Sequence, residues 1–323
     1  MPDRRRTYPE RAKFAEEGRR PCGGPAAAGT RRPAPPQEGI VMPDNWAETA
    51  TGLPTKIDTS VAHEARVYDY WLGGKDNYPA DRALGDAIAT HIPAIRSMAR
   101  ANRAFLGRAV RYVVDAGVTQ FLDIGTGIPT AGNTHEIAQT LASDARVVYV
   151  DNDPAVLAHA RALMSSTREG KTAFIHADLR DPASILRDPS LTATLDLNRP
   201  VAIMLVAIMM YFRDSDDPHA IIENLLESVP SGSYLVITHP TADFDARAMA
   251  RVVASAESAG INFNPRSRAE TETLFAGTEI VEPGVVPVVT WHPELIGDLS
   301  DRAQAIQADP ESAWYWAGIG RKP

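Results

Sequence analysis

The sequence predicts an α/β fold in which a mainly parallel sheet is flanked by helices. From residue 118 onward, short apolar segments typical of strands alternate with amphipathic segments typical of helices, the pattern of successive βα units. The segment over 201–208 is apolar throughout, as expected for a strand covered on both faces. A glycine-rich turn follows the first strand, and doubly wound folds bind ligands with such turns at the carboxyl ends of their strands.

The first 41 residues differ in composition from the rest of the chain. They are rich in Arg, Pro, Gly and Ala without a hydrophobic period, so we expect residues 1–41 to form a disordered leader. The leader holds nine Arg/Lys and five Asp/Glu, a net charge of +4, which leaves −12 for the remainder of a chain whose total is −8. A globular part this acidic is a poor candidate for nucleic-acid binding. Met42 is an alternative start, in which case the leader is not translated.

Cysteine usage and hydropathy exclude further classes of protein. The single cysteine, Cys22, lies in the leader, so the remainder has no disulfide, no thiolate nucleophile and no cysteine-based metal site, and we expect no metal. The longest apolar run, over 201–212, has 12 residues and is too short to span a membrane. No segment resembles a secretory signal. We therefore expect a cytoplasmic protein without a membrane partner; a homo-oligomer is left open.

Residues 42–117 predict an N-terminal helical cap ahead of a ligand-binding domain over 118–323. A first helix over 64–71 is followed by a break at Gly73 and Gly74. A longer helix then ends near Gly117, a typical C′ residue. Its apolar residues recur at spacings of three and four and define one face: Ile95, Met98, Ala99, Phe105, Leu106, Ala109, Val110 and Val113.

Capping signals and apolar runs divide the second part into further elements. Asn133 and Glu136 have the spacing of a capping box, and Asp153 before Pro154 marks another helix start. Predicted strands end at Asp123 and Asp151 and lie over 172–176, 201–208 and 233–238. Further helices are expected from Asp217-Pro218 and near 243–259 and 267–275, and apolar runs at 285–291 and 314–319 can close the sheet.

The turn after the first strand favours one nucleoside ligand over another. Residues 120–130 read Gln-Phe-Leu-Asp-Ile-Gly-Thr-Gly-Ile-Pro-Thr, with Gly125 and Gly127 on either side of Thr126. A dinucleotide fingerprint needs a third glycine where Thr130 stands, and Pro129 removes an amide that a pyrophosphate could use. An NAD(P)-dependent oxidoreductase therefore becomes the weaker alternative. Adenosine with an amino-acid tail needs no pyrophosphate site, which favours S-adenosylmethionine as the cofactor.

Acids at strand ends are the next candidate ligand contacts. Asp151, followed by Asn152, ends the second strand 26 residues beyond Gly125, where doubly wound folds place the carboxylate that accepts two ribose hydroxyls. Asp123 ends the first strand and can bind the methionine amine or simply stabilise the turn.

Asp178 ends the third strand as Asp151 ends the second. It can accept a hydrogen bond from the adenine amine while Leu179 covers the ring, or it can pair with Arg180 at the surface.

Four segments together resemble the S-adenosyl methyltransferase family once named DUF574. They are the turn over 120–130, Val148-Tyr-Val-Asp-Asn-Asp-Pro154, Ala177-Asp-Leu-Arg-Asp-Pro182 and Ala65-Arg-Val-Tyr-Asp-Tyr-Trp-Leu-Gly-Gly-Lys-Asp-Asn77. The resemblance runs from about residue 60 to 322. It implies a Rossmann-like class I methyltransferase sheet of seven strands with an added N-terminal helical segment. The family pattern carries the proline at 129, but Met210 stands where members often have histidine, which argues against a histidine base there.

The resemblance adds cap residues to the candidate cofactor site. Tyr68, Lys75 and Asn77 flank the Gly73-Gly74 hinge, and their polar groups can close over cofactor or acceptor; a solvated loop with a packed tyrosine is the alternative. Arg103 interrupts an apolar helical face and can bind the methionine carboxylate or form a surface ion pair.

The predicted activity is methyl transfer from S-adenosylmethionine to an oxygen or nitrogen of a small-molecule acceptor. His239, just past the fifth strand, is the leading candidate for a general base, followed by Tyr211. The Asn/Asp-Pro-Pro-Tyr box of enzymes that methylate amino groups of bases or amides is absent, which disfavours those acceptors. A cofactor-binding regulator without catalysis is the alternative from another class.

Overall fold

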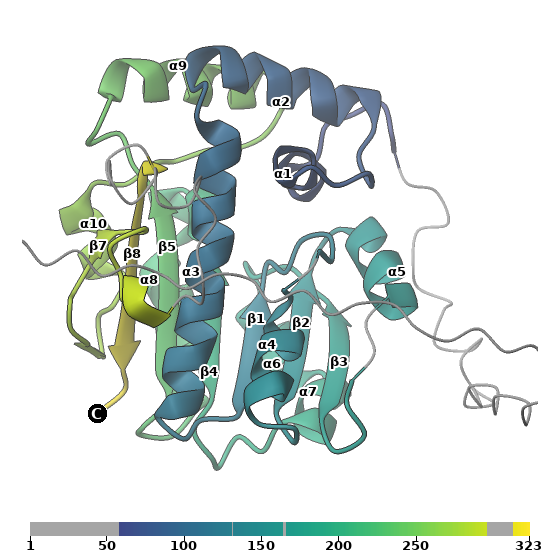
Figure 1. The fold of residues 1–323 in the computed structure, drawn as a ribbon, viewed down its shortest axis with the longest axis vertical. Helices are drawn as coiled ribbons and strands as arrows, with labels where there is room; N and C mark the ends of the chain where they lie inside the picture. Colours follow the sequence, from purple (N-terminus) through teal and green to yellow (C-terminus); the bar gives the residue numbers. More distant parts are fainter. Residues whose placement is uncertain (1–57, 131, 164–165, 296–312) are drawn as a thin grey trace, which may run out of the picture. The chain divides into compact units, whose positions relative to one another are not determined.

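The computed structural model describes residues 58–130, 132–163, 166–295 and 313–323 (Figure 1). The predicted leader and the first part of the predicted cap, up to residue 57, lie outside the described residues.

A single mixed sheet forms the centre of the described fold. Five parallel strands lie in the order β3-β2-β1-β4-β5, and the antiparallel strand β8 continues the sheet beside β5. The two short strands β6 and β7 both pair with β8, so the described residues form eight strands where seven were predicted. The predicted mainly parallel α/β class is confirmed. The strands are β1 Gln120–Ile124, β2 Arg146–Asp151, β3 Lys171–His176, β4 Ala202–Val206, β5 Tyr234–Pro240, β6 Glu279–Ile280, β7 Val286–Pro287 and β8 Tyr315–Arg321.

Helices cover both faces of the sheet. The α-helices are α1 Glu64–Leu72, α2 Pro79–His91, α3 Ile95–Asp115, α4 Thr134–Leu141, α5 Pro154–Leu163, α6 Pro182–Arg187, α7 Pro189–Thr194, α8 Pro218–Glu227, α9 Ala246–Ser258 and α10 Arg268–Thr273. The predicted capping box is present, because the Glu136 carboxylate accepts a 3.0 Å hydrogen bond from the Asn133 amide. Asp153 begins α5 as predicted, accepting from the Ala155 amide at 2.8 Å. None of the helices within the described ranges combines the length and apolar character needed to cross a lipid bilayer.

Two hydrophobic clusters fill the space between the sheet and its helices. On one face, Phe105 and Val110 of α3 pack in one cluster with Phe121 of β1 and Val236 of β5. On the other face, α6, α7 and α8 contribute Ile185, Leu191 and Ile222 to a second cluster. Because α3 shares its core with the sheet, the helical segment over 58–117 is built into this fold and does not enclose a core of its own.

The carboxyl ends of the parallel strands face α1 and α2. In Figure 1, α1, α2 and α9 lie above the edge of the sheet at which β1, β2 and β4 end. This is the edge where open α/β sheets place their ligands. The helices α2, α6 and α7 and the strand β6 were not predicted as separate elements.

The fourth strand is shorter than predicted. It ends at Val206, because Ala207 adopts a left-handed conformation with φ 56° and a 3₁₀ helix, η1 (Met209–Tyr211), follows. The Ala207 amide donates to the Thr238 hydroxyl at 2.9 Å, which fixes the bend. The chain then turns across the strand ends, where Ile208 and Tyr211 meet the turn after β1 and helix α1.

Candidate active site

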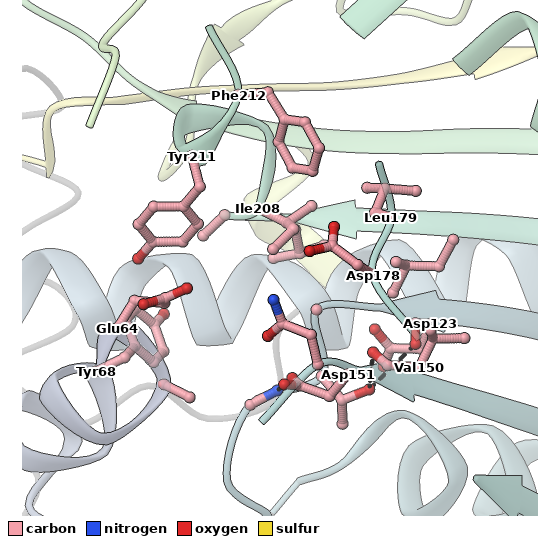
Figure 2. Close-up of a pocket in the computed structure, with 18 of the residues that line it drawn as sticks. Glu64, Tyr68, Asp123, Val150, Asp151, Asp178, Leu179, Ile208, Tyr211 and Phe212 are labelled. Carbon is pink, nitrogen blue, oxygen red and sulfur yellow. Dashed lines mark hydrogen bonds between the residues drawn. The ribbon is translucent and has the colours of Figure 1, made fainter. Parts of the chain in front are cut away.

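A cavity lies at the carboxyl ends of β1, β2 and β4 and is bordered by α1 and α3 (Figure 2). It holds about 1000 Å³, including the solvent at its mouth. We call it the strand-end cavity. Eleven of the fourteen residues predicted to bind cofactor or act in catalysis line it: Tyr68, Arg103, Asp123, Gly125, Thr126, Gly127, Asp151, Asn152, Asp178, Leu179 and Tyr211.

The two glycines of the turn serve different purposes. Both have left-handed backbone, with φ 75° at Gly125 and φ 66° at Gly127. A Cβ atom at Gly125 would lie 2.7 Å from the Ile208 side chain, so the chain's own isoleucine fills the space beside this glycine. A Cβ atom at Gly127 would meet nothing within 4 Å. Only Gly127 therefore leaves open space beside the turn.

Asp151 is held by backbone amides from two directions. Its Oδ2 accepts from the Gly127 amide at 2.8 Å and its Oδ1 from the Asp153 amide at 2.9 Å. Each carboxylate oxygen retains a further acceptor position, because it has two lone pairs. Burial raises the pKa of Asp151 to about 6, against the lowering effect of the two amides. A ligand that donates hydrogen bonds here stabilises the ionised form.

Asp123 is a second buried acid in the same cavity. Its Oδ2 accepts from the Thr134 hydroxyl at 2.6 Å. Burial raises the pKa of Asp123 to about 6, and the Thr134 hydrogen bond and the nearby Arg103 guanidinium offset this only in part. With Asp151, it gives the cavity two carboxyls whose ionised forms a cationic ligand would favour.

The helical segment contributes polar groups from α1 and α3. The Arg103 Nη2 donates to the Asn133 Oδ1 at 2.9 Å, whereas its buried Nε has no partner among the described residues. The Tyr68 hydroxyl donates to the Ala99 carbonyl at 3.0 Å and accepts from the Asn102 amide at 2.9 Å. The buried Asn102 Oδ1 also has no hydrogen-bond partner among the described residues. A polar ligand in the cavity can supply such partners.

Asp178 lies in the wall of the strand-end cavity and also forms the ion pair with Arg180 considered from the sequence. Its carboxylate lines the cavity, yet it also accepts from the Arg180 guanidinium at 3.1 Å. Arg180 in turn lies over the Phe212 ring, 4.8 Å from its centroid. Leu179 is only 4% exposed and contributes an apolar wall.

Lys75 and Asn77 lie outside the strand-end cavity. Lys75 is exposed. Asn77 is buried and donates to the Asp69 carboxylate at 2.8 Å, which holds the loop between α1 and α2. A Cβ atom at Gly74 would lie 1.8 Å from that carboxylate. In this part of the segment over 65–77, Lys75 is thus solvated, whereas Asn77 is packed into the loop.

His239 also lies outside the cavity, which corrects its place as leading candidate for a base. The predicted strand end was 238, but β5 continues to Pro240 and pairs His239 with Trp316 in the sheet interior. The ring Nε2 lies 3.0 Å from the Arg266 Nη1 and the Nδ1 lies 3.0 Å from the Pro240 carbonyl. Because arginine only donates, Nε2 accepts and Nδ1 carries the proton. Burial lowers the pKa of His239 to about 4, so it stays neutral.

A family model of S-adenosyl methyltransferases matches residues 50–323. The chain belongs to this family. A crystal structure of a DUF574 family protein from Streptomyces avermitilis is 47% identical, with a TM-score of 0.77, and the match covers 83% of this chain and all of that one. A candidate methyltransferase from Thermobifida fusca is 41% identical, with a TM-score of 0.73, and covers 82% of this chain and 96% of its own. No curated protein matches the chain.

Membership of the S-adenosyl methyltransferase family confirms the predicted resemblance, the class I methyltransferase fold and S-adenosylmethionine as the family's cofactor. In this family member, sequence reasoning missed several residues that line the strand-end cavity, chiefly His63, Glu64, Asn102, Ile208 and Phe212. Glu64 had a signal, since it directly precedes the family block at 65–77. Ile208 had none, because its contact with Gly125 depends on the bend after β4.

Glu64 and Tyr211 face each other across the cavity. Figure 2 shows the Tyr211 hydroxyl pointing toward Glu64, the first residue of α1, and toward Tyr68. Burial raises the pKa of Tyr211 well above its ordinary value, so the phenol stays protonated and can donate a hydrogen bond.

Proposed function

We propose that this S-adenosyl methyltransferase family member transfers a methyl group to an oxygen or nitrogen of a small molecule at the strand-end cavity. The observation that carries the proposal is the pair of buried acids, Asp123 and Asp151, at adjacent strand ends beside the open turn at Gly127. A nucleoside with a cationic tail can use both carboxylates, and burial raises the pKa of each to about 6 in the free protein.

The polar and apolar groups of the cavity wall match the groups of S-adenosylmethionine one by one. Asp151 has acceptor positions for the two ribose hydroxyls, and Asp178 with Leu179 offers an acceptor and an apolar surface to adenine. Asp123 would bind the ammonium group. Arg103, with an unpartnered Nε, would bind the carboxylate of the same tail. These groups come from β1, β2, the end of β3 and α3.

Methyl transfer depends more on aligning the acceptor atom with the methyl group than on acid–base catalysis. S-adenosylmethionine supplies an activated methyl group: as the acceptor lone pair forms the new bond to carbon, the electrons of the carbon–sulfur bond move to sulfur. The protein's tasks are to hold the acceptor in line and to exclude water. The apolar side chains of Ile208 and Leu179 in the cavity wall serve the second task.

The proposal is tested by calorimetry and by a methyl-transfer screen. The purified full chain is titrated with S-adenosylmethionine, S-adenosylhomocysteine, NAD and NADP, and small-molecule extracts are then incubated with methyl-labelled cofactor. We expect binding of the first two ligands only, together with label in a low-molecular-weight product. Binding of NAD or NADP in their place would restore the oxidoreductase alternative. Cofactor binding without transfer in any fraction would favour the regulator.

A further inference from the structure

A second cavity adjoins the strand-end cavity and has a different chemical character. It holds about 550 Å³, including the solvent at its mouth. Its walls come from α1, α2, α3 and α9, with Val67, Leu84, Ile88, Met98 and Val252 among them. We call it the apolar cavity. Ligand sites are concave and mostly apolar, so this apolar cavity beside the strand-end cavity is a candidate binding site.

The two cavities share two wall residues, Glu64 and Tyr211. On the side of the apolar cavity, the Tyr211 ring packs edge-on against Phe263, with centroids 6.4 Å apart. A molecule in the apolar cavity can therefore present one end to the strand-end cavity between a carboxylate and a phenol.

The charged residue in the wall of the apolar cavity lies where this cavity meets the strand-end cavity. Of its described wall residues, Glu64 alone is an acid, and none is Lys, Arg or His. The polar group of Trp71 is already used, since its Nε1 donates to the Gly85 carbonyl at 3.2 Å. An anionic ligand would find no cation here and would face the Glu64 carboxylate.

We propose that the apolar cavity binds the methyl acceptor, a largely apolar, uncharged or cationic molecule whose nucleophilic oxygen or nitrogen lies between Glu64 and Tyr211. This inference rests on the proposed function and adds the substrate class to it. The acceptor lone pair forms the bond to the methyl carbon, the electrons of the carbon–sulfur bond stay on sulfur, and the acceptor's proton passes to the Glu64 carboxylate. Tyr211, which stays protonated, donates a hydrogen bond to the acceptor.

Two fluorescent probes with the same ring skeleton test the cavity directly. N-phenyl-1-naphthylamine is neutral, and 8-anilino-1-naphthalenesulfonate adds one sulfonate to it; both become fluorescent in apolar surroundings. We expect the neutral probe to bind the wild-type chain about tenfold more tightly than the sulfonate, because only the sulfonate meets Glu64 as a like charge. Glu64→Gln should reduce the ratio of the two probe affinities several-fold, because it removes the carboxylate that repels the sulfonate.

A filled-cavity variant separates this site from nonspecific probe binding. Ala256 on α9 lines the apolar cavity and is 2% exposed, whereas Ala254 on the same helix is exposed to solvent. We expect Ala256→Trp to weaken the neutral probe about tenfold or more, with Ala254→Trp as the unchanged control. Affinity for S-adenosylhomocysteine should stay within about twofold in both. If Ala256→Trp does not fold, Ala256→Leu should give a smaller loss in the same direction.

The outcomes of this experiment are distinct from those of the proposed function. Equal probe binding by folded Ala256→Trp, or no binding by the wild type, overturns the apolar cavity as the acceptor site even if the cofactor binds. Absence of cofactor binding overturns the proposed function whatever the probes show. Once an acceptor is found, Glu64→Gln should lower kcat with little change in KM; an unchanged kcat and pH profile would remove Glu64 as proton acceptor.

Discussion

The backbone amide of Gly127 donates a 2.8 Å hydrogen bond to the carboxylate of Asp151. This bond joins the turn after β1 to the end of β2, the neighbouring strand. The left-handed backbone at Gly127 directs the amide toward the end of β2, and each oxygen of the carboxylate that it meets keeps a further acceptor position. The sequence motif at 125–127 and the acid at 151 thus form one unit.

Replacement of Asp151 should separate cofactor binding from folding. We expect Asp151→Ala to weaken S-adenosylmethionine about tenfold or more, since charge-assisted hydrogen bonds contribute roughly 1.5–3 kcal/mol each. Isothermal titration measures the affinity, and thermal unfolding with the cofactor absent measures the fold. Asp144→Ala, at an exposed position after α4, is the matched control. Unchanged affinity in Asp151→Ala would contradict the ribose assignment.

Cofactor affinity should fall as the pH drops below about 6. Burial raises the pKa values of Asp123 and Asp151 to about 6 in the free protein, and the ribose hydroxyls and the ammonium group both favour the ionised carboxylates. Titrations between pH 5 and 8 should show the decrease, and Asp151→Asn should flatten it. A pH-independent affinity would mean that neither acid changes protonation on binding.

The same two acids predict how the cofactor changes stability with pH. A carboxyl whose pKa is raised from 3.8 to about 6 by folding stabilises the free protein fully below 3.8, and this contribution is lost as the pH rises through 6. Bound cofactor offsets this loss of stability, because it stabilises the ionised forms of Asp123 and Asp151. Its effect on the melting temperature should therefore be larger at pH 8 than at pH 5, at equal cofactor concentration.

His239 should matter for stability and not for the chemical step. His239→Ala removes the acceptor for a buried Arg266 donor, which should cost about 1–3 kcal/mol of unfolding free energy. Cofactor affinity should stay unchanged, since His239 does not line the strand-end cavity. Urea unfolding measures the change in stability, and isothermal titration measures the cofactor affinity. Loss of one limb of the pH–rate profile in this variant, with the fold intact, would return His239 to the catalytic residues.

The sequence predicted the parts of the site that local patterns determine. The acid at 151, the glycine turn and the capping box at Asn133 follow from short-range backbone requirements, and the structure has all three. Whether His239 lies in the cavity depends instead on where β5 ends. The end of β5 is set by pairing with β8, more than 70 residues away in the sequence. Glu64 reaches the cavity only because α1 lies over the strand ends, a tertiary arrangement that its position beside the segment at 65–77 does not specify.

The contact between Gly125 and Ile208 predicts a graded response to alanine at three glycines. Gly117, Gly125 and Gly127 all have positive φ, so alanine at each should cost about 1 kcal/mol in backbone strain. At Gly117 and Gly127 the added Cβ meets nothing within 4 Å, whereas at Gly125 it lies 2.7 Å from the Ile208 side chain. We expect Gly125→Ala to cost roughly 2–5 kcal/mol, because steric overlap adds to the strain.

A second substitution tests whether Ile208 is the cause of that larger cost. Ile208→Ala alone should destabilise by removing apolar contacts, but combined with Gly125→Ala it should recover about 1–3 kcal/mol relative to the sum of the single changes. Chemical unfolding of the four proteins gives this coupling. Gly127→Ala and Gly117→Ala should lower the free energy of unfolding by similar amounts. Gly127→Ala should also bind S-adenosylhomocysteine more weakly, because Gly127 lines the strand-end cavity and Gly117 does not. Equal costs at Gly125 and Gly117 would show that the turn can shift away from Ile208.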